Sequence, residues 1–438
     1  MSTDGAASET SLRHNLHINN LNGISAVIAF SLVNPFFGIF ALKVGASNIQ
    51  VALLSSLPAL MSMITIIPGA LLVERSRGKK FLTGAFIGLS RLFIIGAAVV
   101  PLFPKAAQPA ALVGMVSLMS LPGSIANVGW QGLIAEIIPH EWRGEAFAVR
   151  NCWMSFFGMA AVLAGGWVMD AMPFPRGYQL MFLLGFVAGV AEVYYFSRLR
   201  ASRPLSATPI GRRGTGERPG GLAGRLRGEL ARVKAEKSLF QFLVASVGFH
   251  FAWMGAWPIF TVYKVDVLGA SNLWMSIFAI SSSIGSIVSY RWWARLADRR
   301  SNATVLFWTA LGIASIPVTW VWVKSLAVGV VMDLYGGVIV AGLQLVLFNR
   351  LLEVATPERR TVDLAYFNTL VQAAATVSPM VGMWLYDTLG YQVTMAVFAG
   401  LRVLAAVGYL WSARSALGET AGQAAKSVLT PTQKAKLS

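Results

Sequence analysis

The stretch Gly45-Ala46-Ser47-Asn48 recurs 224 residues later as Gly269-Ala270-Ser271-Asn272. Further matches follow in the same order, at separations of 217 and then 213 residues: Glu136 with Glu353, Asp170 with Asp387, and Gly177-Tyr178-Gln179 with Gly390-Tyr391-Gln392. A conserved order with small changes of spacing is what an old duplication leaves in a chain. The two halves run in the same direction, which predicts two similar bundles around one central site.

The chain is apolar along most of its length. Hydrophobic residues make up 55% and charged residues 13% of the 438 positions, whereas a soluble domain carries about 25% charged residues. The apolar runs are long enough to cross a bilayer core of about 30 Å as helices, and lipid offers unpaired backbone groups no other partner. The sequence therefore predicts an all-α membrane protein with twelve transmembrane helices. These are expected at 18–42, 48–73, 81–104, 109–137, 146–170, 178–198, 239–263, 271–295, 303–323, 326–350, 362–386 and 392–412.

Basic residues alternate between the loops at the two ends of these helices. One set of loops holds only five of them: Lys43, Lys105, Arg176, Lys264 and Lys324. The other set is rich in Lys and Arg and includes the segment 198–237. Because cytoplasmic loops collect Lys and Arg, we expect both termini and the central loop in the cytoplasm, with the protein in the cell membrane. This asymmetry accounts for the formal charge of +17 without a nucleic-acid partner.

Five segments follow from this organisation. They are a cytoplasmic N-terminal segment (1–17), an N-terminal six-helix bundle (18–198), a cytoplasmic central loop (199–238), a C-terminal six-helix bundle (239–413) and a disordered cytoplasmic tail (414–438). Within the central loop, residues 221–237 alternate apolar and basic positions at helical spacing. This pattern favours either an amphipathic helix on an anionic membrane surface or a solvated linker helix.

The loop after the second helix reads Glu74-Arg75-Ser76-Arg77-Gly78-Lys79-Lys80, and its counterpart reads Asp298-Arg299-Arg300-Ser301-Asn302. Together with the duplicated six-helix halves and the basic central loop, these loops resemble the major facilitator superfamily over roughly residues 15–413. The signature of that superfamily in the loop after the second helix is approximately Gly-x-Leu-Ala-Asp-Arg-x-Gly-Arg-Lys. The resemblance implies a monomeric secondary active transporter. It would move a small organic solute between two parallel-repeat six-helix bundles by alternating access, without a cofactor or bound metal.

The resemblance also implies a latch at the cytoplasmic ends of the helices. The acid of each loop would face a helix N-terminus in the other half, Glu74 near 361–364 and Asp298 near 144–147, where the helix dipole favours an anion. The alternative is a set of solvated charges worth about 0–1 kcal/mol each. The candidate gating residues are Glu74, Arg75, Glu136, Arg143, Asp298, Arg299, Glu353 and Arg360.

In this fold, the first, fourth, seventh and tenth helices line the central cavity. Their candidate substrate-binding residues are Asn34, Asn127, Gln131, His250, Trp253, Trp257, Asp333 and Gln344. Polar residues inside a membrane are costly and often functional, and the rings offer a stacking surface to a ring-bearing or amphipathic solute. The alternatives are helix-to-helix hydrogen bonds, a structural histidine and plain aromatic packing. Asp333 and His250 are titratable, so proton coupling through them is one expectation.

Three charges lie on helices that do not line the cavity: Arg91, Glu192 and Arg402. We expect each to reach inward to carboxylates or carbonyls, or to snorkel. A second class of function is a lipid or lipid-linked solute flippase or exporter on the same fold, in contact with membrane lipids. The sequence contains no phosphate-binding loop, which argues against ATP-driven transport, and nothing in it indicates an enzyme.

The loop asymmetry predicts that positions 215 and 106 lie on opposite sides of the membrane. In a Cys152→Ser background, Thr215→Cys should resist a membrane-impermeant maleimide added to intact cells, because the basic central loop stays in the cytoplasm. Ala106→Cys should be labelled under the same conditions. Labelling of position 215 from outside would overturn this topology.

Overall fold

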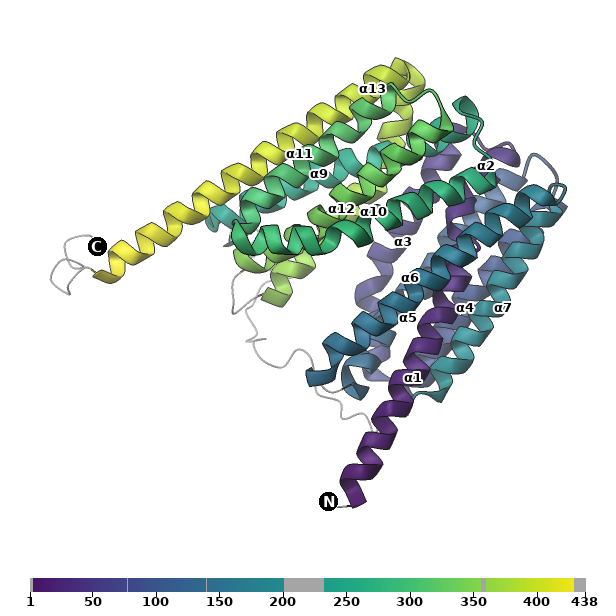
Figure 1. Cartoon of the computed structure of the whole chain (residues 1–438), viewed down its shortest axis with the longest axis horizontal. Helices are drawn as coiled ribbons and strands as arrows, with labels where there is room; N and C mark the ends of the chain where they lie inside the picture. Colours follow the sequence, from purple (N-terminus) through teal and green to yellow (C-terminus); the bar gives the residue numbers. More distant parts are fainter. Residues whose placement is uncertain (1–2, 77, 139, 201–231, 356–359, 429–438) are drawn as a thin grey trace, which may run out of the picture.

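The computed structural model describes residues 3–76, 78–138, 140–200, 232–355 and 360–428. Its helices form two bundles that meet at one end and diverge toward the chain termini (Figure 1). The first bundle contains α1 (Thr3–Ser31), α2 (Phe37–Lys43), α3 (Asn48–Arg75), α4 (Lys79–Val99), α5 (Gln108–Ile137), α6 (His140–Ala171) and α7 (Arg176–Arg198). The second contains α9 (Lys237–Val262), α10 (Asn272–Arg299), α11 (Asn302–Val321), α12 (Leu326–Val354) and α13 (Arg360–Val428).

The prediction of twelve transmembrane helices in two parallel-repeat bundles is confirmed. Among the described residues, eleven helical segments are long and apolar enough to cross a membrane, and the last, Val362–Ala413, is 52 residues long. Gly390, at φ 77°, breaks that segment into two helices, a backbone conformation that glycine adopts without steric cost. Helix α13 continues to Val428, so the backbone of residues 414–428 is helical where the sequence predicted a disordered tail.

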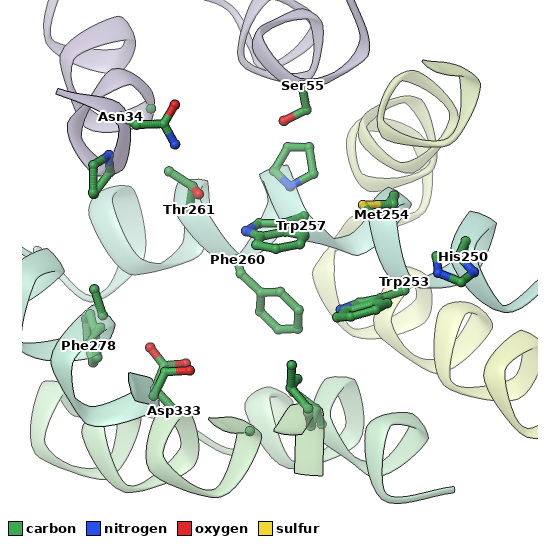
Figure 2. Close-up of a pocket in the computed structure, with 18 of the residues that line it drawn as sticks. Asn34, Ser55, His250, Trp253, Met254, Trp257, Phe260, Thr261, Phe278 and Asp333 are labelled. Atoms are coloured by element: carbon green, nitrogen blue, oxygen red, sulfur yellow. The ribbon is translucent and has the colours of Figure 1, made fainter. Parts of the chain in front are cut away.

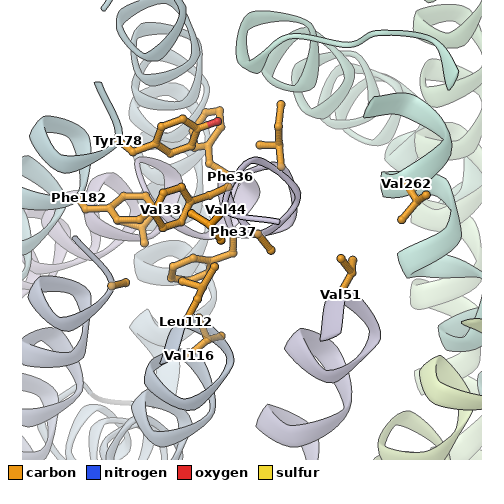
Figure 3. Close-up of a cluster of buried hydrophobic side chains, with 14 of the residues drawn as sticks. Val33, Phe36, Phe37, Val44, Val51, Leu112, Val116, Tyr178, Phe182 and Val262 are labelled. Carbon is orange, nitrogen blue, oxygen red and sulfur yellow. The ribbon is translucent and has the colours of Figure 1, made fainter. Parts of the chain in front are cut away.

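The first membrane span is interrupted by a 3-10 turn at Asn34–Phe36. Pro35 causes the interruption, because proline has no N–H to donate to the carbonyl four residues earlier, and α1 ends there, at Ser31. A cluster of buried side chains fixes the turn, including Phe36, Phe37, Tyr178 and Phe182 (Figure 3). The rings of Phe37 and Phe182 meet edge to face with centroids 5.6 Å apart. The break therefore holds Asn34 in a fixed place between the bundles.

The repeated Gly-Ala-Ser-Asn stretch is a turn followed by a helix cap in both bundles. Gly45 and Gly269 have φ of 83° and 68°, which a side chain would oppose. Ser47 and Ser271 then cap α3 and α10 by accepting a backbone N–H three residues ahead, an interaction worth about 1 kcal/mol. The duplication has thus retained a complete helix start in each half.

The asparagine that follows each cap joins the two bundles. The side-chain amide of Asn272 donates to Asp170 Oδ1 at 2.8 Å, and the backbone N–H of Leu273 donates to Asp170 Oδ2 at 2.7 Å. In the mirrored pair, Asn48 Nδ2 donates to Asp387 Oδ1 at 2.6 Å. Each bundle therefore supplies one aspartate and one asparagine. We call these two pairs the crossed clamp.

The clamp lies where α6 packs on α10 and α3 on α13, at the end of the molecule away from the chain termini (Figure 1). Ser276 reinforces it by donating to the Val162 carbonyl across the interface at 2.7 Å. A Cβ at Gly166 would collide with the Asn272 carbonyl, so only glycine permits this approach of α6 to α10. The two bundles are thus held tightly together at one end.

Loss of the clamp's charge should open this end. Asp170→Asn removes an anion from the N-terminus of α10, an effect of about 0.3–2 kcal/mol, which changes populations several-fold when two states are nearly balanced. A cysteine at Ser55, which lines the space between the bundles, should then react faster with an impermeant maleimide added from the clamp side, in a Cys152→Ser background.

The matched control is Asp266→Asn, which neutralises an exposed acid in the π-helical turn that follows α9. It should leave the labelling rate of the Ser55 position unchanged. Equal rates in the Asp170→Asn variant and the parent would reject the clamp as a barrier.

Candidate functional site

A cavity of about 990 Å³ lies between the two bundles. The first bundle contributes Asn34, Gly38, Ser55 and Val116, while α9, α10, α12 and α13 of the second supply most of the remaining lining. Figure 2 shows side chains from α9 projecting into this space, with Asp333 opposite them. We call it the central cavity.

Six of the eight predicted binding residues line the central cavity: Asn34, His250, Trp253, Trp257, Asp333 and Gln344. The other two, Asn127 and Gln131, do not. Both lie on α5 and are exposed, and Asn127 lines a separate cavity inside the first bundle. Asn127 is 11 positions beyond Val116 on the same helix, which corresponds to about 16 Å along the axis. Their role in substrate binding stays a prediction.

The ion pair between Lys264 and Asp333 is the main feature that the sequence reading missed. Lys264 Nζ lies 2.5 Å from Asp333 Oδ2, and 4.4 Å and 4.8 Å from the ring centroids of Phe278 and Trp320. The side chains of Lys264 and Asp333 are only 12% and 19% exposed. Cation–π contacts of this kind stabilise a desolvated ammonium.

The pattern of basic loops predicts that Lys264 lies in a loop outside the membrane. A π-helical turn at Tyr263–Val267 instead extends the helical segment past its expected end and places Lys264 on the cavity wall. The signal in the sequence was the opposite charges of Lys264 and Asp333 near the same end of two cavity-lining helices.

Tryptophan rings form an aromatic wall along α9. Trp253 and Trp257 stack with centroids 6.2 Å apart and planes 15° apart. Trp257 is 54% exposed although it lines the central cavity, so part of its ring is free to meet a bound molecule. Phe260 continues the same wall toward Asp333 (Figure 2). Flat rings of this kind suit stacking against a planar or amphipathic solute.

His250 is held by its own helix. Its Nδ1 lies 2.8 Å from the carbonyl oxygen of Ser246, and since a carbonyl can only accept, Nδ1 carries the proton. The ring also meets Phe367 edge to face at 5.9 Å. These contacts are those of an oriented, largely buried imidazole on the cavity wall.

The comparison with known families agrees with this architecture. A family profile described as Major Facilitator Superfamily matches residues 21–353. The chain belongs to the major facilitator superfamily. Among curated proteins, none matches the chain significantly.

Solved structures of major facilitator superfamily transporters share the fold. A bacterial homolog of the human lysosomal transporter Spinster, in an inward-facing and unoccupied conformation, superimposes with a TM-score of 0.65 at 13% identity, covering 94% of this chain and 98% of that one. The nucleoside transporter NupG gives 0.68 at 12%, covering 91% and 99%. The D-xylose-proton symporter gives 0.63 at 15%, covering 91% and 96%. Identities this low establish the fold alone.

The superfamily latch remains a prediction. Glu353 accepts hydrogen bonds from Asn302 at 2.6 Å and from Arg350 at 2.9 Å, both within its own bundle. Arg75 and Arg299 are exposed, and the bundles diverge at this end (Figure 1). The side chains of three further candidates lie outside the described ones: Glu136, Arg143 and Arg360.

The pair of Lys264 and Asp333 should behave as a coupled unit in stability. Lys264→Met or Asp333→Leu alone leaves one charge without its partner, which costs about 3–5 kcal/mol in a buried setting. The double variant removes both charges and should recover most of that loss. Thermal unfolding in detergent measures the change in stability of each variant. Glu353→Gln is the control, because Glu353 pairs with Arg350 at a more exposed position. It should change stability by only about 0–1 kcal/mol. Additive losses in the double variant would contradict the pairing.

Proposed function

We propose that this protein is a secondary active transporter that moves a small organic solute across the cell membrane by alternating access. The observation that carries the proposal is the position of the central cavity between two bundles that are clamped together at one end and diverge at the other. Parallel-repeat transporters expose a midplane site to each side in turn by rocking one half against the other. The crossed clamp supports a state in which the cavity communicates with the terminal end.

The cavity wall indicates the chemistry of the solute. A volume of about 990 Å³ is at the upper end of the range of about 300–1,000 Å³ for small-molecule sites. The Trp253–Trp257 stack supplies an apolar surface, and the Lys264–Asp333 pair supplies one charge of each sign. We therefore favour a ring-bearing or amphipathic solute with one charged or strongly polar group. The lipid-flippase alternative gains no support from the described residues of this cavity.

Coupling to protons would act through Asp333. A solute group that takes Lys264 releases the carboxylate from its cation, and a buried carboxylate without a partner binds a proton more readily. His250 is the weaker candidate, because its Nδ1 is already engaged with the Ser246 carbonyl. Asp333 thus connects solute occupancy with protonation.

Both termini are proposed to face the cytoplasm, as the basic loops predict, and the protein is proposed to act as a monomer.

A thermal-shift screen of the purified protein against metabolite, drug and lipid panels would identify the solute. A compound that occupies the central cavity should stabilise the parent protein, and stabilise a Trp257→Ala variant less, because aromatic stacking is worth about 0.5–1.5 kcal/mol. Trp322→Ala is the matched control, since Trp322 is 75% exposed and lies outside the lining. If compounds stabilise both variants as well as the parent, they bind elsewhere.

Asp333→Asn should uncouple transport from the proton gradient. Asparagine keeps an oxygen acceptor for Lys264 but cannot exchange a proton, so accumulation driven by a pH gradient should be abolished while solute exchange at equal concentrations continues. Proteoliposomes loaded with the identified solute measure both modes. Asp266→Asn, an exposed acid on the neighbouring turn, should leave both unchanged. Full gradient-driven accumulation in Asp333→Asn would place the coupling elsewhere.

A further inference from the structure

A second cavity of about 310 Å³ lies inside the first bundle. Helices α1, α4, α5, α6 and α7 all contribute to it, and its polar lining consists of Asn22, Ser90, Arg91, Asn127, Arg150 and Glu192, together with the indole of Trp130. It shares no lining residue with the central cavity. Along α5 it lies about 16 Å closer to the terminal end, as the spacing of Val116 and Asn127 indicates. We call it the side cavity.

The two arginines of the side cavity are in different electrostatic situations. Arg91 forms an ion pair with Glu192, at 2.8 Å from NH2 to Oε2, and its Nε also donates to that oxygen at 2.8 Å. Arg150 makes no ion pair with any carboxylate among the described residues. Its Nε donates to the backbone carbonyl of Asn19 at 3.4 Å. The cavity therefore carries one cation more than its anions neutralise.

Arg150 is nevertheless only 8% exposed. Its guanidinium carbon lies 4.5 Å from the centroid of the Trp130 ring, a cation–π contact worth about 0.5–2 kcal/mol. Burying an ionised group costs several kcal/mol. The Trp130 contact, one long hydrogen bond and the attraction of Glu192, which already pairs with Arg91, offset that cost only in part. The site is thus prepared for a negative charge.

One buried hydrogen-bond donor of the side cavity is unused. The Trp130 Nε1 atom is buried without a partner. Asn22 Nδ2 donates to the Glu192 carbonyl at 3.0 Å, and the Ser90 hydroxyl donates to the Met119 carbonyl at 3.1 Å, so these carbonyls are already used. Asn127 lines the cavity and is exposed. An unused N–H beside an unpaired guanidinium favours a ligand that can only accept.

We propose that the side cavity binds a small organic or inorganic anion, with its carboxylate or phosphate group on Arg150 and with Trp130 Nε1–H and the Asn127 amide as further donors. The planar fork of arginine matches the oxygens of either group. A volume of about 310 Å³ is about ten times the roughly 30 Å³ that one water molecule occupies in the liquid, which leaves room for a small carboxylate or phosphate. The site is independent of the solute that the central cavity takes, so the proposal stands or falls separately from the transport function.

Isothermal titration calorimetry on the purified full-length protein tests the proposal, with succinate and inorganic phosphate as probes and succinamide as an uncharged match for succinate. At least one anion should bind and succinamide should not. Arg150→Gln should weaken anion binding at least tenfold, and Arg150→Lys should weaken it less because the charge remains. Trp130→Phe keeps the ring and removes only the Nε1–H, so it should weaken binding several-fold in a protein that still folds.

Two controls separate this site from other basic residues. Arg295→Gln removes an exposed arginine from α10 and should leave affinity unchanged. The Lys264→Met/Asp333→Leu double variant, which removes both charges of the central-cavity pair, should also leave it unchanged. The proposal is overturned if neither probe binds the parent protein, if Arg150→Gln and Trp130→Phe both keep full affinity, or if the double variant abolishes binding while Arg150→Gln does not. Preference between succinate and phosphate decides which anion group the cavity takes.

Discussion

The structure depends most on a carboxylate placed against a helix N-terminus in the opposite bundle. Asp170 accepts from Asn272 and from the backbone N–H of Leu273 at the first turn of α10, where the helix dipole favours an anion. Asp387 accepts from the side-chain amide of Asn48 at the start of α3. Both pairs join the bundles at the same end, and in this structure the bundles diverge at the other (Figure 1). The central cavity owes its position and its opening to that geometry.

The fold was predictable because it follows from two features of the sequence, the pattern of apolar runs and the repeat shared by the two halves. Runs of apolar residues fix the number of spans, and the recurrence of Gly45–Asn48 at 269–272 fixes their parallel arrangement. All four clamp residues belong to positions that match between the halves. Their cross-pairing was not predictable, because it depends on how one bundle sits against the other, and periodicity within a helix carries no information about that.

The sequence predicted which types of residue line the candidate site better than it predicted how far along each helix they lie. Asn34 and Asp333 reach the cavity, whereas Asn127 lies too far along α5, a difference set by tilt and packing rather than by pattern. The sequence did not predict a role for Lys264 in the cavity, because a lysine near a helix end usually marks only the orientation of the helices in the membrane. The π-helical turn at Tyr263–Val267 places it on the cavity wall.

The charges on the peripheral helices reach inward: Arg402 donates to the carbonyls of Ala252 and Ile313, and Arg91 pairs with Glu192. The sequence predicted these kinds of partner but not which residues supply them.

We propose that closure of the clamp end and separation of the terminal ends are one motion. Spin labels on α3 and α13 test it at both ends of the same two helices, in a Cys152→Ser background: Ile49→Cys with Thr388→Cys beside the clamp, and Leu72→Cys with Val362→Cys at the terminal end, all at exposed positions. Pulsed electron spin resonance in lipid, across pH and with added solute, should give distances that change in opposite directions at the two ends. Distances that lengthen or shorten together at both ends would contradict the account.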